Sequence, residues 1–295
     1  MALTRIGAGD VTLEVEVGGA PDGPLAVLVH GYPDQRRVWD LVAADLGADH
    51  RLVTYDVRGA GGSTAPSSRA GYRLASLVDD LVAVLDHVAP DGEPVHLVGH
   101  DWGSIQLWDA VLHESDDERL RGRIASFTSI SGPALEQLGR FLRDTSSRQR
   151  LPTLGRQLLR SWYVGIFQVP VVPELVLAVL AGPVRRVLET TQRIDPSHWG
   201  ESFGRDARRG VNLYRANRVR FGRPVTRVAV QLVVPTKDAF VGPALLAGIE
   251  QLAPDLRRVD VVADHWVVRT QPDVVAEAVR SFVADVGARL SAREA

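Results

Sequence analysis

One carboxylate in the sequence stands where a side chain can attack a substrate. The apolar run 95–98 leads into Gly99-His100-Asp101-Trp102-Gly103, and a helical pattern follows. Two glycines at this spacing let a strand and a helix approach closely around a central residue, whose side chain then stands above the sheet. The helix dipole favours the ionised form of Asp101. The pattern therefore predicts a carboxylate nucleophile, with simple capping of the helix as the alternative role.

A second loop can supply backbone donors for an oxyanion. The apolar run 25–29 ends in His30-Gly31-Tyr32-Pro33-Asp34, and we expect this run beside the strand that carries the nucleophile. The backbone N–H of Tyr32 can then join that of Trp102 in an oxyanion hole. A Gly-Pro turn without a catalytic role is the simpler alternative, and a cis bond before the proline is compatible with both.

An ester formed on Asp101 needs an activated water, and one histidine is placed to provide it. His265 follows an expected strand at 258–262 and precedes the last helix, at the carboxyl edge of the sheet. Asp238 follows the preceding strand and is the candidate that orients this histidine. The order of nucleophile, acid and histidine matches that of the α/β-hydrolases. A core histidine and a turn-forming aspartate are the alternatives, and the side-chain direction of Asp264 disfavours that nearby competitor.

The elements that must position these residues follow from periodicity. Expected strands lie at 11–17, 25–30, 51–56, 95–99, 125–131, 228–234 and 258–262, and helical patterns lie at 37–46, 74–88, 104–112 and 272–290. Such alternation predicts an α/β fold with a mostly parallel sheet flanked by helices. Residues 134–222 show helical and loop patterns without a convincing strand. We expect an α/β-hydrolase core from 1–133 and 223–295, with 134–222 inserted as a helical cap.

Composition excludes several classes of protein. The 295 residues are 45% hydrophobic and 24% charged, as in ordinary globular chains. A formal net charge of -2 offers no basic field for nucleic acid. The absence of cysteine removes disulfides, thiolate metal sites and cysteine nucleophiles. His30, His96 and His100 lack ligand spacing, so we expect no metal site, and without a visible secretory signal we expect a cytoplasmic protein.

These landmarks resemble those of the α/β-hydrolase epoxide hydrolases over essentially the whole chain. In chain order the matching segments are 30–33, 56–63, 99–103, 237–238 and 265–266. The resemblance implies opening of an epoxide by Asp101 without a cofactor, with two cap tyrosines that bind the epoxide oxygen. Tyr163 and Tyr214 lie in similar sequence contexts. Each has the alternative role of a core residue whose hydroxyl finds a backbone partner. Asp264 and the segment 236–237 depart from the family pattern.

The substrate class follows from the apolar side chains around these positions. We expect the pocket to be lined by His30, Pro33, Trp162, Phe167, Phe240 and Trp266. An apolar pocket favours a lipophilic epoxide, such as a fatty-acyl or lipid-derived one. The stretch 162–181 is almost long and apolar enough to span a membrane, but two prolines and Glu174 within it favour a buried or cavity-lining helix pair. Shallow membrane contact through the cap and a homodimer both stay open.

Haloalkane dehalogenases share the Asp-Trp-Gly turn and are the main alternative. Resemblance to them would require a halide cradle, commonly a Trp after the nucleophile with either an Asn after His-Gly or a cap Trp. This chain has Trp102, but it has Tyr32 in place of the Asn and it has the tyrosine pair, which dehalogenation does not use. An inactive binding protein on the same fold is a further alternative. The chain also resembles the hydrolase portion of actinobacterial polypeptides that continue into a short-chain dehydrogenase domain. No nicotinamide-binding Gly-x-x-x-Gly-x-Gly unit occurs here, so we assign no redox activity to these residues.

Overall fold

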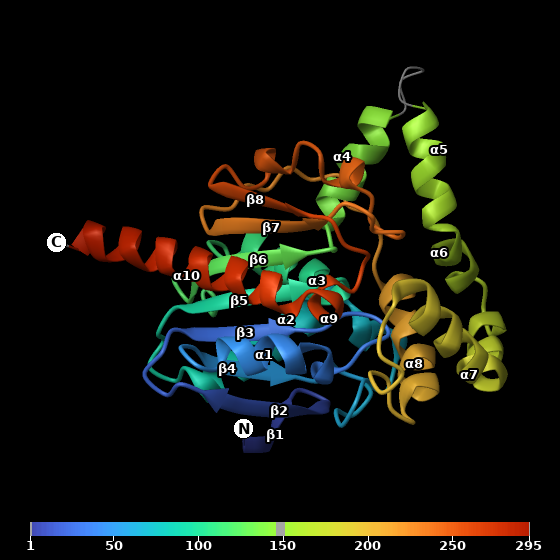
Figure 1. Cartoon of the computed structure of the whole chain (residues 1–295), viewed down its shortest axis with the longest axis horizontal. Coiled ribbons are helices and arrows are strands. Elements are labelled where there is room, and N and C mark those ends of the chain that lie inside the picture. The colour runs from blue at the N-terminus through green and yellow to red at the C-terminus, as the bar shows by residue number, and fades with distance from the viewer. Residues whose placement is uncertain (1, 146–150, 295) are drawn as a thin grey trace.

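The computed structural model describes residues 2–145 and 151–294. Within them, eight strands form one sheet in the order β1-β2-β4-β3-β5-β6-β7-β8 (Figure 1). The strands are β1 (Ala2–Ala8), β2 (Val11–Gly19), β3 (Leu25–Val29), β4 (Arg51–Tyr55), β5 (Val95–His100), β6 (Ile124–Ile130), β7 (Ala229–Pro235) and β8 (Leu256–Val261). Strand β2 pairs antiparallel with both β1 and β4, and β3 to β8 run parallel to one another. The parallel register brings the carboxyl ends of β3, β5, β7 and β8 to one edge.

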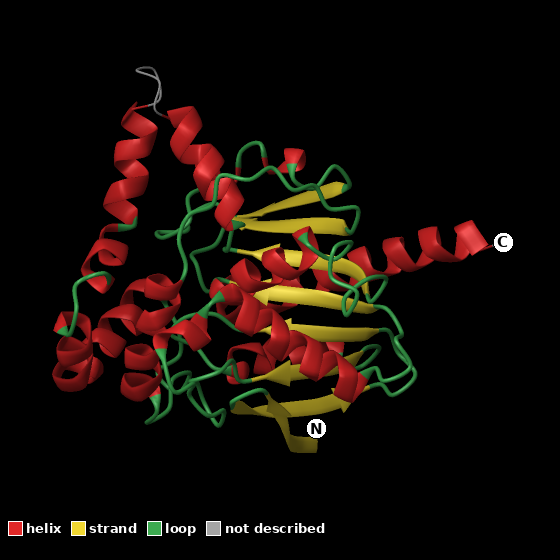
Figure 2. Ribbon diagram, turned by 180° about the vertical axis from the view of Figure 1, so that it is seen from behind, coloured by secondary structure: helices red, strands yellow, loops and turns green. Residues whose placement is uncertain are grey.

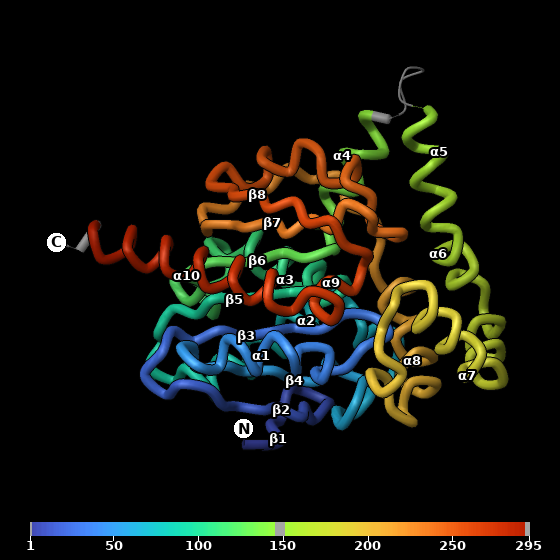
Figure 3. Tube along the Cα trace, viewed as in Figure 1, coloured from blue at the N-terminus to red at the C-terminus, as the bar shows by residue number. Residues whose placement is uncertain are grey.

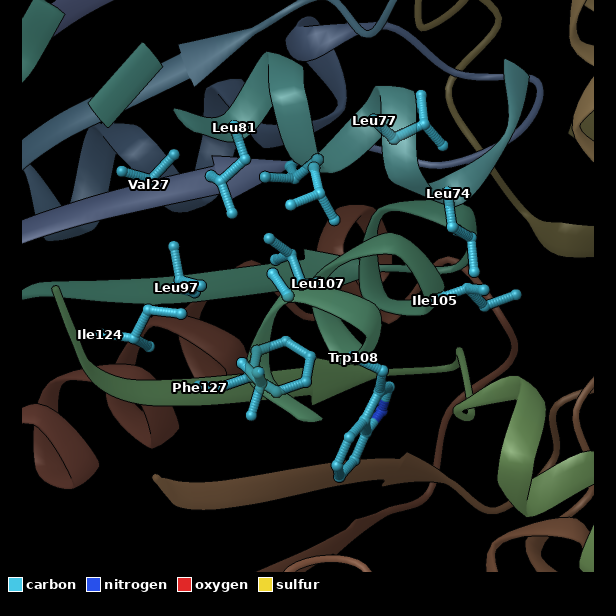
Figure 4. Packing of buried hydrophobic residues seen from close by; sticks show 14 of the residues in the cluster. Val27, Leu74, Leu77, Leu81, Leu97, Ile105, Leu107, Trp108, Ile124 and Phe127 are labelled. Atoms are coloured by element: carbon cyan, nitrogen blue, oxygen red, sulfur yellow. The ribbon is translucent and has the colours of Figure 1, made fainter. Parts of the chain in front are cut away.

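Helices cover both faces of the sheet, as the alternating pattern predicts. One face carries α1 (Asp40–Leu46), α9 (Val267–Thr270) and α10 (Pro272–Glu294), and the other carries α2 (Leu74–Val88) and α3 (Trp102–Leu112). Figure 4 shows Leu81 and Leu107 packed with Leu97 and Phe127 of the sheet. Short 3-10 turns are η1 (Arg36–Trp39), η2 (Arg69–Tyr72), η3 (Pro243–Leu246) and η4 (Ile249–Gln251). The hydrophobic cores on the two faces of the sheet hold the strand ends in fixed positions.

A helical region is inserted between β6 and β7. It contains α4 (Leu135–Thr145), α5 (Leu151–Arg160), α6 (Trp162–Phe167), α7 (Val172–Gln192) and α8 (Phe203–Ala216). Figures 2 and 3 show that the chain leaves the sheet at its carboxyl edge, passes through these helices and returns to β7. The inserted region agrees with the sequence prediction, and the bounds 134 and 222 remain a prediction. The cap thus lies against the edge where the predicted site residues end their strands.

One strand and one burial pattern differ from the sequence prediction. The prediction missed β1, because the residues that alternate inward in this edge strand are Thr4, Ile6 and Ala8, of which only Ile6 is strongly apolar. The prediction of a buried or cavity-lining pair of helices across 162–181 is wrong for their outer side. Leu175 is 60% exposed and Val179 is 78% exposed, whereas Leu177 is buried. No helix among the described residues is long and apolar enough to cross a membrane.

Candidate active site

Asp101 lies at the turn between β5 and α3 in a rare backbone conformation, with φ 53° and ψ -123°. The residues two positions before and two positions after it must be glycine. A Cβ on Gly103 would lie 2.1 Å from the carbonyl oxygen of Val29, and one on Gly99 would lie 2.6 Å from the Cα of Ser104. Strand and helix can therefore approach closely only with glycine at both places. This turn is the local feature that the sequence motif predicts, and it lifts the carboxylate above the sheet.

The loop after β3 directs a backbone donor at this carboxylate. The Tyr32 N–H donates to Oδ1 of Asp101 at 2.8 Å. The loop can lie this close because residue 31 is glycine: a Cβ there would be 2.5 Å from the Asp101 side chain. The backbone N–H of Trp102 is the second donor, and both N–H groups lower the pKa of Asp101. The structure thus brings the two predicted oxyanion donors to the Asp101 carboxylate.

The three predicted catalytic side chains meet at the carboxyl edge of the sheet. Nε2 of His265 lies 3.6 Å from Oδ2 of Asp101, and Nδ1 lies 2.9 Å from Oδ2 of Asp238. The other oxygen of Asp238 accepts hydrogen bonds from the N–H groups of Phe240 (2.7 Å) and Val241 (2.9 Å). Asp238 is therefore held on both oxygens and orients the imidazole, whose second nitrogen faces Asp101.

Burial and mutual charge set the pKa values of this triad. Burial raises the pKa of Asp101 to about 6, although the charge of His265 and the two N–H groups oppose the rise. Burial alone would lower the pKa of His265, but the charge and hydrogen bond of Asp238, with the charge of Asp101, raise it to about 9. For Asp238 the interactions with His265 outweigh burial and lower the pKa. Only Asp101 among the carboxylates here is destabilised in its charged form.

The two predicted cap tyrosines lie next to each other above the triad. The ring centroids of Tyr163 on α6 and Tyr214 on α8 are 5.9 Å apart. Tyr214 packs edge-on against Trp102 at 4.9 Å. Tyr163 contacts Phe240 at 5.7 Å, and Phe240 contacts His265 at 5.0 Å. The aromatic contacts therefore link both cap helices to the nucleophile turn and to the catalytic histidine.

Both tyrosines keep their protons at neutral pH. Burial raises the pKa of Tyr163, and the negative charge of Asp101 raises it further, while a hydrogen bond with Tyr214 opposes the rise. Burial likewise raises the pKa of Tyr214 well above its usual value, with the neighbouring tyrosine and Asp101 adding to the effect. A neutral phenol is a hydrogen-bond donor. The pair can therefore donate to an oxygen atom held between the cap and Asp101.

The remaining pocket candidates fall into three places. Nε2 of His30 accepts from the N–H of Val57 at 2.8 Å, so Nδ1 carries the proton and donates to the Gly31 carbonyl at 2.9 Å. His30 thus supports the oxyanion loop, and with Pro33 it lines a cavity of about 20 Å³ below that loop. Phe167 packs on Tyr214 at 5.0 Å, and Trp266 packs on Phe240 at 5.9 Å.

Trp162 is the expected pocket residue that the structure does not bring to the others. Its side chain is 65% exposed. Successive residues of a helix point about 100° apart, whereas positions four apart share a face. Tyr163 and Phe167 therefore share the inner face of α6, with ring centroids 5.5 Å apart, and Trp162 lies on the outer face.

A buried carboxylate beside the site was not assigned a role from the sequence. Oδ1 of Asp34 accepts hydrogen bonds from the Trp199 indole (2.7 Å) and from Nε2 of His198 (2.8 Å), and Oδ2 accepts from the Trp266 indole (2.8 Å). Burial raises the pKa of Asp34, but the hydrogen bond and charge of His198 and the other partners outweigh it and lower the pKa to about 2. Its place directly after the oxyanion loop was the only local signal, because its partners are distant in sequence.

No group of three or more His, Asp or Glu side chains within residues 2–145 and 151–294 is arranged to hold a metal ion. The cap helices α6 and α8, the oxyanion loop and the triad form a site that combines a carboxylate, an oriented imidazole and two phenols. Such a site can alkylate Asp101 and then hydrolyse the resulting ester with water.

Comparison with known proteins shows which family model and which relatives the chain resembles. A family model described as alpha/beta hydrolase fold matches residues 24–162. The chain is 38% identical over 287 residues to "Probable oxidoreductase EphD" of Mycobacterium tuberculosis, covering 92% of this chain and 48% of that protein. It thus spans about half the length of that relative, in agreement with the expected resemblance to part of a longer polypeptide. It is 26% identical over 288 residues to "Epoxide hydrolase 3" of Xenopus tropicalis, covering 90% of this chain and 72% of that protein.

Solved structures share the fold. An epoxide hydrolase from Bacillus megaterium, in complex with an inhibitor, superposes with a TM-score of 0.80 at 20% identity, covering 95% of this chain and 100% of that one. Potato epoxide hydrolase I superposes with a TM-score of 0.77 at 19% identity, covering 96% of this chain and 99% of that one. At such identities the likeness establishes the fold alone.

Proposed function

We propose that this chain, which has the α/β-hydrolase fold, opens a lipophilic epoxide to a vicinal diol. The observation that carries the proposal is the contact between Tyr163 and Tyr214, with ring centroids 5.9 Å apart, on the cap side of a buried carboxylate nucleophile. An epoxide needs both a nucleophile at carbon and an acid at oxygen, and the leaving oxygen stays attached to the substrate. Two neutral phenols facing one carboxylate fit that demand.

In the first step Asp101 attacks a ring carbon of the epoxide. The Tyr163 and Tyr214 hydroxyls hold the epoxide oxygen, and Oδ2 of Asp101 approaches the carbon from the opposite side. The new bond joins Oδ2 to carbon, the ring C–O bond breaks, and one tyrosine gives its proton to the departing oxygen. The tyrosinate regains a proton from solvent. The product of this step is a hydroxyalkyl ester on Asp101.

In the second step His265 activates water. Ester formation removes the negative charge of Asp101, which is one of the causes that raise the pKa of His265. The imidazole therefore loses its proton more readily in the ester and becomes a base. Water gives it a proton and attacks the ester carbonyl carbon. The N–H groups of Tyr32 and Trp102 stabilise the oxyanion by about 3–4 kcal/mol per donor. The departing diol oxygen takes the proton from His265, and the carboxylic acid left on Asp101 then gives its proton to the imidazole, which restores the carboxylate beside a protonated His265.

The proposed substrate is apolar because aromatic rings surround the reacting atoms. Phe167 and Phe240 flank the tyrosine pair, and the indole of Trp102 lies below Tyr214. These surfaces favour alkyl or acyl chains over charged groups. A fatty-acyl or other lipid-derived epoxide is the class that we propose.

The test is capture of the ester. His265→Gln removes the base of the second step, so the variant should accumulate an adduct on the peptide that contains Asp101 when it is treated with alkyl, aryl or fatty-acyl epoxides. Mass spectrometry should find the whole mass of the epoxide added, because ring opening expels no atom. Asp101→Asn in the same background is the control and should give no adduct. An adduct on another peptide, or diol formation without the Asp101 carboxylate, would overturn the proposal.

Haloalkane dehalogenation is the alternative, because haloalkane dehalogenases also have a tryptophan directly after the nucleophile, as Trp102 is here. The structure gives this indole another partner, because its N–H makes a hydrogen bond with Tyr214, which only partly offsets the rise that burial causes in the pKa of that tyrosine. The double variant Tyr163→Phe with Tyr214→Phe separates the two reactions. Diol formation should fall by at least 100-fold, about 3 kcal/mol of lost acid catalysis. Release of halide from chloroalkanes or bromoalkanes that survives in this variant would favour dehalogenation. Thermal stabilisation by epoxides with neither product would indicate a binding protein.

A further inference from the structure

The side of the cap that faces away from the sheet exposes an apolar surface. Figure 1 shows α5, α6 and α7 along the end of the molecule furthest from β1 to β8, with α8 between α7 and the core, and Figure 2 agrees. We call this surface the outer cap face and define it by Leu158, Leu159, Trp162, Ile166, Val172, Leu175, Val176 and Val179, all exposed. The most exposed are Leu159 at 77% and Val179 at 78%.

The spacing of these residues makes them one continuous surface. Val172, Leu175, Val176 and Val179 recur at three and four along α7 and so share a face. The opposite face of α7 packs Leu177 against α8, so the helix is apolar on both sides. Contiguous exposed apolar patches beyond about 300–600 Å² are rare on monomeric proteins and mark interaction sites. The outer cap face is therefore a candidate surface for an apolar partner.

The charge of the cap indicates what covers it. Residues 134–222 contain 15 arginines and 7 acidic residues, whereas the whole chain has a net charge of -2. Arg156 on α5 and Arg186 on α7 are exposed, whereas the guanidinium of Arg160 lies against Gly242 of the core. Within the described part of the chain, no ion pair joins the guanidinium groups of Arg156 and Arg186 to a carboxylate. They are therefore available to phosphate groups.

Apolar side chains, an exposed tryptophan and exposed arginines are the features of helices that lie in the interface of an anionic bilayer. We propose that the outer cap face docks on an anionic lipid bilayer, with its apolar side chains in the headgroup region and its arginines on lipid phosphates. A second copy of this chain would bring an equally cationic face and would be repelled. The docking is peripheral, because no described helix is long and apolar enough to span a membrane.

Docking in this orientation would place α6 between the lipid and the candidate active site. Trp162 and Ile166 lie on its outer face, and Tyr163 and Phe167 lie on its inner face. A lipophilic molecule dissolved in the bilayer would then reach the cap without crossing water. The inference about binding does not depend on the reaction, since vesicle binding can be measured without any substrate.

Trp162 provides a direct probe. The chain has six tryptophans, and the five others are at most 5% exposed. When the full chain is mixed with phosphatidylglycerol vesicles, its fluorescence should shift to the blue and be quenched by brominated acyl chains, because only Trp162 can enter the lipid. Co-sedimentation should fall at least tenfold when phosphatidylcholine replaces phosphatidylglycerol, and should weaken as salt rises. Trp162→Phe should sediment as before without the spectral shift.

Matched variants test the surface itself. Leu159→Ser with Val179→Ser should reduce sedimentation with phosphatidylglycerol at least tenfold. Leu3→Ser with Leu41→Ser, which changes two exposed leucines of the core, should leave it unchanged. Circular dichroism and thermal unfolding establish that both variants fold. Three outcomes would overturn the proposal. The unmodified chain could fail to bind vesicles, or both double variants could lose binding equally. The chain could also form a concentration-dependent dimer that only Leu159→Ser with Val179→Ser dissociates.

Discussion

Asp101 combines a reactive position with an unfavourable charge. Its side chain is buried, and burial raises its pKa to about 6. The N–H of Tyr32 and the imidazole of His265 recover part of the lost solvation, on one oxygen each. The carboxylate is therefore ionised near neutral pH but weakly solvated, which is the state of an effective nucleophile.

This balance predicts how ester formation depends on pH. Only ionised Asp101 attacks, so the rate of alkylation should fall as pH drops through about 6, the raised pKa of this carboxyl group. His265→Gln removes the positive charge that lowers this pKa, so the midpoint should move upward in that variant. Rapid-quench measurement of the ester in single turnovers between pH 4.5 and 8 gives both midpoints. A rate of alkylation that stays flat down to pH 5, or a lower midpoint in the variant, would contradict this account.

At the scale of elements, the cap is joined to the core by a few buried contacts. Asp34 at the end of the oxyanion loop holds His198 and Trp199 from the segment before α8, and Trp266 from the turn before α9. Helix α8 also packs directly on the oxyanion loop: a Cβ on Gly210 would lie 2.5 Å from the ring of Tyr32. The position of Tyr214 over Trp102 thus depends on how α8 sits on the core.

We expect Asp34→Asn to loosen this junction. An amide replaces one acceptor oxygen by a donor, which leaves an indole or imidazole N–H unpaired, so the free energy of unfolding should fall by about 3 kcal/mol. Because the pKa of Asp34 is lowered to about 2, its contribution is present above pH 4 and disappears as pH falls toward 2. Urea unfolding at pH 7 measures the loss, and hydrogen exchange should rise in 194–216.

The exposed Asp22 provides the control for this prediction. Asp22→Asn makes the same chemical change without a buried partner, so its unfolding free energy should stay within about 0.5 kcal/mol of the unmodified protein. Equal stability of Asp34→Asn and Asp22→Asn would show that the buried carboxylate does not join the cap to the core.

At the scale of the whole molecule, two aspartates of one site should affect stability in opposite directions. The pKa of Asp101 is raised in the folded state. Ionisation of this group therefore destabilises the folded state once the pH rises above the pKa that Asp101 has in the unfolded chain. The pKa of Asp238 is lowered, so its ionised form stabilises the folded state, and this contribution is lost as pH falls. The negative charge that the proposed attack requires therefore lowers the stability of the folded state at Asp101, whereas the charge of Asp238 raises it.

Unfolding in urea at pH 8 should make this conflict visible. Asp101→Asn should be more stable than the unmodified protein by about 1–3 kcal/mol, and the gain should shrink at pH 4, where Asp101 is protonated. Asp238→Asn should be less stable at pH 8, because the hydrogen bond to a charged imidazole and two N–H groups lose their carboxylate. Changes of the same sign in both variants would refute the opposed roles.

Local chemistry determined much of the fold and the site. The five-residue motif around Asp101 made the turn visible, although only Gly99 is required by the helix that follows it, whereas Gly103 is required by the close approach of Val29 in β3. Strand and helix periodicities indicated the mostly parallel sheet and the inserted helical region, because burial on one face repeats locally. The order of Asp101, Asp238 and His265 followed, since parallel strands end at a common edge. Each of these inferences needs only neighbours in the chain.

Only the tertiary structure decided which distant groups meet. Asp34 lies 164 residues from His198 and 232 residues from Trp266, and no local pattern relates positions that far apart. Hydrophobicity likewise could not show that Trp162 is exposed while Tyr163 faces the triad, because an apolar helix has the same sequence whether protein or lipid covers it. The pairing of surfaces depends on how whole elements pack, which is a property of the assembled molecule.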